Sequence, residues 1–381
     1  MLFKMKIGLL TLPFNNNYGG YLQAYALMTI LKQMGHEVEL IYRRHNKRPL
    51  KYRLIYPFKT VVKCILKIPH GPLFSSREYD HRQAGKMMMP FVDKNISPKT
   101  KPYFTTVCME KSCKGKYDVV IVGSDQVWRP MYVPNINDFF LEFIKDKNVR
   151  KIAYAASFGT ATPEYTDLQK KVCGKLISEF QAISVREKSA LKVIENFGWQ
   201  VNSMPQLVLD PTFLLPSKEY LKHIKLKRCD QIFCYVLDRT ERTRELILYA
   251  EKLLKLPCYE ILKDVNEKTF LKPSIEIWLS NIYNARFILT DSFHGMVFSI
   301  IFNKPFAVYV NKDRGADRFV SLLSLIGLED RMINDLSDVD KIINNSIKWD
   351  SVNEKLENLR NNSIQFLNDS LTSNSTKNNK K

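Results

Sequence analysis

The sequence lacks the patterns that mark membrane-spanning, metal-binding or disulfide-rich proteins. No apolar run approaches the roughly 20 residues that a transmembrane helix needs. The seven cysteines form no CxxC pair, and neither HxxH nor HExxH occurs, so we expect no metal site. An odd number of irregularly spaced cysteines is typical of reduced thiols in a cytosol. We therefore expect a cytoplasmic protein that holds no metal.

Acidic residues are missing from one long stretch, between Glu39 and Glu78. Within it, residues 43–77 mix lysines and arginines with aromatic and aliphatic side chains, and the whole chain has a formal net charge of +19. This mixture suits an anionic membrane surface, where each Lys or Arg contributes about 1 kcal/mol. Nucleic acid would also attract such charge, but no nucleic-acid-binding motif accompanies it, so we expect none. A solvated basic insertion without any partner is the third interpretation.

Strand-like and helix-like segments alternate along the chain in two series. The first series has expected strands at 6–12, 38–42, 117–124, 151–157, 182–185 and a short one ending at 210, with helices near 21–35, 164–181 and 187–197. A Lys-rich connector at 217–228 leads to expected strands at 231–238, 258–262, 286–292 and 305–310, with helices at 241–255, 274–284 and 294–303.

This alternation predicts an α/β protein with two doubly wound, Rossmann-like domains that face a cleft. We expect the first domain at 1–210, including the basic insertion 43–77, and the second at 211–368. The low-complexity segment 369–381 is expected to be a disordered tail. Ligands of such folds bind at the carboxyl ends of the strands, so the strand-to-helix junctions are the places to search for a site.

Two junctions of the first domain carry candidate binding residues. After the first strand, Asn17, Gly19 and Gly20 precede a helix; glycines allow a backbone to approach a ligand, and a helix N-terminus offers N–H groups to an anion. An ordinary Asn-Gly turn is the alternative there. The run Gly123-Ser124-Asp125 ends another strand, either as a polar ligand loop or as a helix N-cap.

A third junction, TDSFHG, supplies the candidate catalytic residues His294 and Asp291, with Ser292 and Gly295 as binding residues. A helix N-terminus disfavours an imidazolium and a nearby aspartate favours it, so His294 is expected to titrate near the working pH. The alternative is a structural histidine in a buried turn.

Arginines near these junctions are candidate anion ligands. Arg186 follows a short strand and could bind a phosphate or carboxylate through its planar fork. The alternative for Arg186 is an exposed arginine paired with Glu187 or Asp230. Arg314 and Arg318, in DRGADRF, are candidates for the same binding role.

Several of these segments together resemble the polysaccharide pyruvyl transferase family: NNNYGGYLQAYAL, YDVVIVGSDQVW, YAASFG, ISVREKSA, VLDPTFLL and WLSNIYNARFILTDSFHGMVFSIIFNKPFAVY. They occur in the family's order from about residue 5 to 330. The resemblance implies a two-domain fold similar to GT-B glycosyltransferases. It also implies transfer of pyruvate from phosphoenolpyruvate to a sugar of a cell-surface polysaccharide or its lipid-linked precursor, forming a ketal, with no cofactor beyond that donor.

The resemblance assigns roles to two residues: His294 matches the family's essential histidine, and Arg186 matches an arginine that holds the donor. The sequence departs from the family at Ser292-Phe293-His294, where better characterised members have Arg-Leu-His and use the arginine to bind phosphoenolpyruvate. Lys312, Arg314 or Arg318 could replace that arginine. An acceptor on a lipid pyrophosphate would place the protein at the inner face of the cytoplasmic membrane.

Two other functions share this architecture: a GT-B-type glycosyltransferase that uses a nucleotide sugar, and a non-catalytic relative that binds a glycan. The first would be supported by a nucleotide-binding acidic residue late in the second domain, and the sequence there has no convincing candidate for such a residue. The second is favoured by the missing arginine but opposed by the presence of His294, Arg186 and Asp291.

Overall fold

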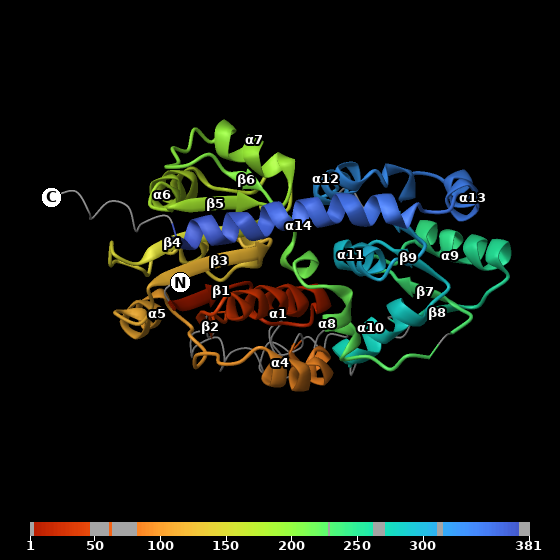
Figure 1. Cartoon of the computed structure of the whole chain (residues 1–381), viewed down its shortest axis with the longest axis horizontal. Helices are drawn as coiled ribbons and strands as arrows, with labels where there is room; N and C mark the ends of the chain where they lie inside the picture. Colours follow the sequence, from red (N-terminus) through yellow and green to blue (C-terminus); the bar gives the residue numbers. More distant parts are fainter. Residues whose placement is uncertain are drawn as a thin grey trace.

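A computed structural model describes residues 4–45, 61–62, 82–227, 229–261, 271–310 and 315–372. Most of the basic stretch 43–77, the candidates Lys312 and Arg314, and residues 373–381 of the expected tail lie outside these residues. Within them, two parallel sheets stand side by side along the length of the molecule (Figure 1).

The first sheet has six parallel strands in the order β2-β1-β3-β4-β5-β6. Its strands are β1 (Lys6–Leu10), β2 (Glu37–Ile41), β3 (Val119–Asp125), β4 (Arg150–Ala156), β5 (Ala182–Val185) and β6 (Gln206–Leu207). Its helices are α1 (Tyr18–Gln33), α4 (Met89–Asn95), α5 (Thr106–Cys113), α6 (Asp167–Ile177) and α7 (Lys188–Asn196). The strand order reverses between β1 and β3, and a reversal of this kind opens a crevice at the carboxyl ends of the two strands.

The second sheet repeats this topology with five parallel strands in the order β11-β10-β9-β7-β8. Its strands are β7 (Ile232–Tyr235), β8 (Cys258–Glu260), β9 (Phe287–Thr290), β10 (Phe306–Tyr309) and β11 (Met332–Ile333). Its helices are α8 (Ser217–Leu221), α9 (Glu241–Leu254), α10 (Ile275–Asn284), α11 (Phe293–Ile301), α12 (Asp317–Ile326) and α13 (Leu336–Asn344). Here the reversal lies between β7 and β9, so the junction that carries His294 opens onto the second crevice.

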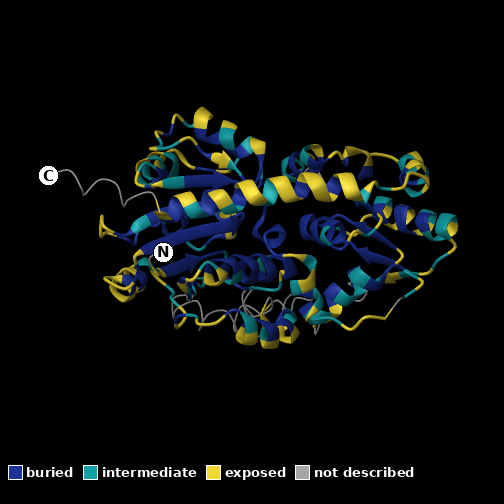
Figure 2. Ribbon diagram, viewed as in Figure 1, coloured by how far each residue is buried: buried dark blue, intermediate teal, exposed yellow. Residues whose placement is uncertain are grey.

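The central strands β3, β7 and β9 are buried on both faces, and Figure 2 shows the buried interior of the two sheets. In β3, Val119 and Ile121 join one core cluster while Val120 and Val122 join another, because successive side chains of a strand point to opposite faces. The first of these clusters also contains Phe233 of β7. A continuous apolar core therefore connects the two sheets.

Side-chain contacts also join the two halves next to the first junction. The ring of Tyr18 stacks on Trp278 with centroids 5.0 Å apart, and its hydroxyl donates to the carbonyl of Pro273 at 2.7 Å. A further contact between the halves is the N–H of Lys188, which donates to Ser321 Oγ at 3.1 Å. The N-terminus of α1 is thus held against the second half of the chain.

The long C-terminal helix α14 (Trp349–Thr372) runs back from the second sheet across the first (Figure 1). Arg150 Nη1 donates to the carbonyl of Ser370 at 2.9 Å, and Ser363 Oγ accepts the N–H of Leu209 at 3.0 Å. The helix extends to Thr372, so the expected tail starts later than residue 369. The chain after residue 211 therefore does not pack with the second sheet alone.

Two expectations from the sequence are wrong. Arg43 was counted in the basic stretch, but it is 1% exposed and its Nε donates to Asp138 Oδ2 at 2.7 Å. It is paired inside the protein and does not face a membrane. The structure also joins Cys234 to Cys258 in a disulfide, against the expectation of reduced thiols.

None of the described helices is long and apolar enough to cross a membrane.

Candidate functional site

Polar side chains from four strand ends meet between the two sheets. Asp125 ends β3, Arg186 follows β5, Asp210 follows β6 and His294 opens α11 after β9. All four are buried, with 3 to 6% of their surface exposed. Ion-pair contacts link them into one cluster, so three residues chosen from sequence, Asp125, Arg186 and His294, do lie together.

Arg186 lies between two aspartates. Its Nη2 donates to Asp125 Oδ1 at 2.9 Å, and its Nη1 donates to Asp210 Oδ2 at 2.7 Å. Its Nε is 3.7 Å from Glu187 Oε2 and makes no hydrogen bond within the described residues. Of the two expected alternative partners, Glu187 is therefore a neighbour, whereas Asp230 pairs with Arg286 at 3.8 Å.

The charges of this cluster shift its pKa values in opposite directions. Burial alone would raise the pKa of Asp125, but the charge of Arg186 outweighs burial and lowers it. Burial also opposes ionisation of Asp210, yet the contact with His294 and the charge of Arg186 bring its pKa below the usual range. Burial dominates at Glu187 and raises its pKa. The two aspartates are thus held as carboxylates, whereas Glu187 is biased towards its neutral acid.

Asp125 has a backbone conformation that few residues other than glycine adopt, with φ at +63°. Such a conformation costs of order 1–3 kcal/mol and is most often found at functional sites. It places Oδ1 on Arg186 and Oδ2 within 3.5 Å of Asn17 Nδ2. Asn17 in turn caps α1, since its Oδ1 accepts the N–H of Gly19 at 3.1 Å. The first two predicted junctions are therefore in contact.

His294 is enclosed by Asp210 and Gly19. Its Nε2 lies 3.6 Å from Asp210 Oδ2 and makes no hydrogen bond within the described residues. A Cβ at position 19 would lie 1.9 Å from Nδ1, so only glycine allows α1 to approach the ring this closely. The imidazole thus lies where the two halves of the chain meet.

Phe293 contacts two arginines. The guanidinium carbon of Arg186 is 4.9 Å from the centre of its ring, and that of Arg318, on α12, is 5.5 Å away. Burial and the charge of Arg186 lower the pKa of Arg318 to about 10. Arg318 is therefore a cation beside the histidine motif. The candidates Lys312 and Arg314 fall outside the described residues.

The residues beside His294 have local structural roles. Ser292 is the N-cap of α11, and its Oγ accepts the N–H of Gly295 at 3.3 Å. Asp291 accepts the N–H groups of Leu237 and Asp238 at 2.7 and 2.8 Å, which fixes the loop after β7. The carboxylate found facing His294 is that of Asp210, which the sequence placed only at the end of a short strand.

The remaining candidates also contribute to packing. A Cβ at Gly123 would lie 2.6 Å from the carbonyl oxygen of Tyr154, and one at Gly295 would lie 2.4 Å from Thr290 Oγ1. Gly20 is different, because the nearest atom to its added Cβ would be Asn17 Nδ2 at 3.5 Å. Ser124 Oγ donates to Asp210 Oδ2 at 3.3 Å and so belongs to the cluster.

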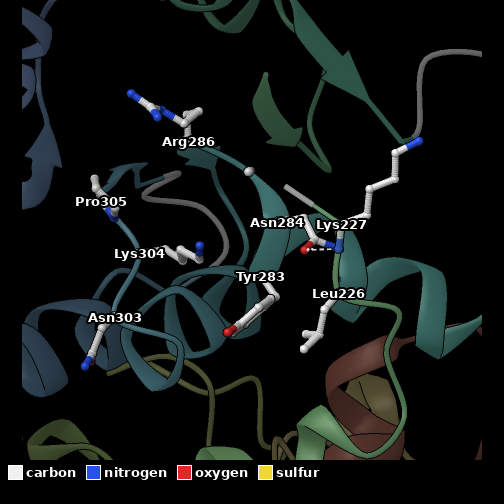
Figure 3. A pocket seen from close by; sticks show the side chains of 9 residues that line it. Leu226, Lys227, Tyr283, Asn284, Arg286, Asn303, Lys304 and Pro305 are labelled. Carbon is white, nitrogen blue, oxygen red and sulfur yellow. Dashed lines mark hydrogen bonds between the residues drawn. The ribbon is translucent and has the colours of Figure 1, made fainter. Parts of the chain in front are cut away.

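The described residues contain no group of three or more His, Cys, Asp or Glu side chains that could hold a metal ion. A pocket of about 520 Å³ lies at the opposite ends of β9 and β10, lined by Lys227, Tyr283, Arg286 and Lys304 among others (Figure 3). Because it opens at the amino ends of these strands, it is separate from the cluster around His294.

Comparisons with known proteins agree with the two-sheet fold. Two solved structures have the same fold over nearly their whole length. An Arabidopsis thaliana protein in complex with UDP-L-rhamnose has a TM-score of 0.51 at 10% identity and covers 98% of both chains. A putative UDP-N-acetylglucosamine 2-epimerase from Listeria monocytogenes has a TM-score of 0.55 at 10% identity, covering 97% of this chain and 98% of its own. At this identity the likeness establishes the GT-B-like fold alone.

A search of curated proteins finds no significant match. The sequence model of the family described as "Polysaccharide pyruvyl transferase" matches residues 17–313, which include Asn17, Asp125, Arg186, Asp210 and His294. Because the match extends over most of the chain, the protein belongs to the polysaccharide pyruvyl transferase family.

Proposed function

We propose that this member of the family transfers pyruvate from phosphoenolpyruvate to two hydroxyls of one sugar, forming a ketal. The acceptor would be a polysaccharide or its lipid-linked precursor. One observation carries the proposal beyond family membership: His294 is buried in the crevice with a ring nitrogen that makes no hydrogen bond within the described residues. A buried polar atom without a partner costs free energy, so we expect Nε2 to gain a hydrogen bond when substrate binds and the contacts of the cluster tighten.

The reaction requires an acid and a base at one place. The methylene carbon of phosphoenolpyruvate gains a proton, two sugar hydroxyls add in turn to the neighbouring carbon, and phosphate leaves. One hydroxyl proton balances the proton gained by carbon, and the other leaves with phosphate. A histidine can deliver one proton and accept the other, and such a general acid–base group contributes about 10²–10⁴-fold in rate.

The donor's negative charge needs cations and N–H groups. Arg318 lies beside Phe293, and the first N–H groups of α11 have no intrahelical acceptors. Arg186 forms ion pairs with Asp125 and Asp210, which leaves its Nε–H for the substrate. In this proposal Arg318 supplies the guanidinium that the family has at the position of Ser292, and Arg186 aligns the carboxylates.

Calorimetric titration with phosphoenolpyruvate tests the proposal, with UDP- and GDP-sugars titrated in parallel. We expect binding of phosphoenolpyruvate alone, weakened about tenfold to a hundredfold in Arg318→Gln by loss of a charge-assisted hydrogen bond. The control is Arg244→Gln, because Arg244 is an exposed arginine of α9. Binding of a sugar nucleotide without phosphoenolpyruvate would assign the protein to nucleotide-sugar chemistry, and binding of neither would favour a non-catalytic relative.

A further inference from the structure

Asp210 is fixed by the turn that follows it. It caps the 3-10 helix at Pro211–Phe213, and its Oδ1 accepts from the N–H and the hydroxyl of Thr212 at 3.1 and 2.8 Å. A carboxylate held at one oxygen by two donors of its own turn has little freedom to rotate. Its second oxygen, Oδ2, is therefore presented to the site in a set direction.

That second oxygen is shared by three side chains. Arg186 Nη1 donates to it at 2.7 Å, Ser124 Oγ donates at 3.3 Å, and His294 Nε2 lies 3.6 Å away. The last distance is a few tenths of an ångström beyond a hydrogen bond, and contacts between catalytic groups commonly tighten when substrate binds. Among the described residues, Nε2 has no other polar partner.

The opposite nitrogen of the ring faces the N-terminus of α1. Position 19 is a glycine there, and its added Cβ would overlap Nδ1 at 1.9 Å. A carboxylate can only accept hydrogen bonds, so a neutral imidazole that bonds to Asp210 must carry its proton on Nε2. The lone pair is then on Nδ1, at the meeting point of the two halves of the chain.

We propose that Asp210 positions His294 by binding its Nε2–H, so that Nδ1 is the atom that exchanges protons with the substrate. This inference rests on the proposed function only for the identity of the reaction. The charge pattern agrees with it, because the pKa of Asp210 is lowered despite burial, which keeps it an acceptor. Arg186 shares the same oxygen and limits the charge that Asp210 offers to the ring.

Nitrogen-15 NMR of the full chain labelled at histidine tests the assignment without any substrate. The signals of His294 are identified by their absence from His294→Gln. We expect the neutral ring of the unmutated protein to be protonated at Nε2. A neutral ring protonated at Nδ1 would overturn the proposal, and this result requires no variant of Asp210 to fold.

Asp210→Asn gives the second readout, with Asp138→Asn as a matched control, since Asp138 is an equally buried aspartate whose ion pair is with Arg43. We expect Asp210→Asn to change the tautomer of His294 and to lower kcat by about 100-fold or more, with KM for phosphoenolpyruvate changed much less. Asp138→Asn should leave the tautomer as it is. An unchanged tautomer in Asp210→Asn contradicts the proposal. If the tautomer shifts as expected but no protein form consumes phosphoenolpyruvate, the proposed reaction fails and the role of Asp210 stands.

Discussion

The imidazole of His294 lies against the backbone of Gly19, so closely that a Cβ on Gly19 would be 1.9 Å from Nδ1. The two residues are on different halves of the chain: Gly19 is in the first turn of α1, and His294 is in the first turn of α11. The stack of Tyr18 on Trp278 holds α1 in this place. The ring of His294 thus explains why position 19 has no side chain.

Gly19→Ala should displace the ring of His294 and lower kcat by about 100-fold, because a side chain in the first turn of α1 occupies the place of Nδ1. Alanine is otherwise about 1 kcal/mol better than glycine within a helix, so the helix itself is not the cause of any loss. Gly20→Ala is the comparison, since its Cβ would meet nothing closer than 3.5 Å. Steady-state kinetics of the two variants decides: equal losses would mean that the contact with His294 does not matter.

Arg186→Gln should destabilise the fold. It removes the cation from between Asp125 and Asp210, which are nearly fully buried. Breaking a buried ion pair by removing one partner costs about 3–5 kcal/mol. The free energy of unfolding in urea measures this loss, and Arg244→Gln on the surface should change it by less than about 0.5 kcal/mol. If Arg186→Gln is as stable as the unmutated protein but binds phosphoenolpyruvate weakly, the main role of Arg186 is to bind the donor substrate.

Asp125→Asn should make the free energy of unfolding less dependent on pH under acidic conditions. The pKa of Asp125 is lowered in the folded protein, while an unfolded aspartate titrates near about 3.9. A group with a lowered folded pKa stabilises the fold above its unfolded pKa, and this contribution disappears as the pH falls through the folded value. The difference in unfolding free energy between the unmutated protein and Asp125→Asn should therefore shrink below about pH 4. A difference that stays constant between about pH 6 and pH 3 would contradict the ion pair with Arg186.

The order of elements could be predicted because hydrophobic periodicity is a local signal. Strand β5 has the expected bounds, and the others differ mainly at their ends. The short strand β11 was missed, because its two residues give too short a pattern to recognise. The path of α14 could not be predicted either, since an amphipathic helix does not specify which sheet it will cover.

The position of the site could be predicted from sequence, but the contacts between its residues could not. The rule that ligands bind at strand ends found Asp125, Arg186 and His294, since each lies at or shortly after the carboxyl end of a strand. It applied equally to Asp210, which follows β6, but the strand expected there was short and Asp210 was assigned only as its last residue. Asp291 was assigned to His294 because it is near in sequence, whereas the loop after β7 uses its carboxylate. Contacts between residues far apart in sequence depend on how the strands are ordered.

The basic stretch gives the last prediction, and Arg43 provides its internal control. Neutralising Arg48, Lys51, Arg53 and Lys59 together should release the protein from vesicles rich in anionic lipid, because each cation contributes about 1 kcal/mol near such a surface. Arg43→Gln should leave vesicle binding unchanged and reduce stability, since Arg43 is buried against Asp138. Sedimentation with the vesicles measures the first effect and urea unfolding the second. If the unmutated protein does not sediment at low salt, where such attraction is strongest, the membrane interpretation is wrong and the charge serves another purpose.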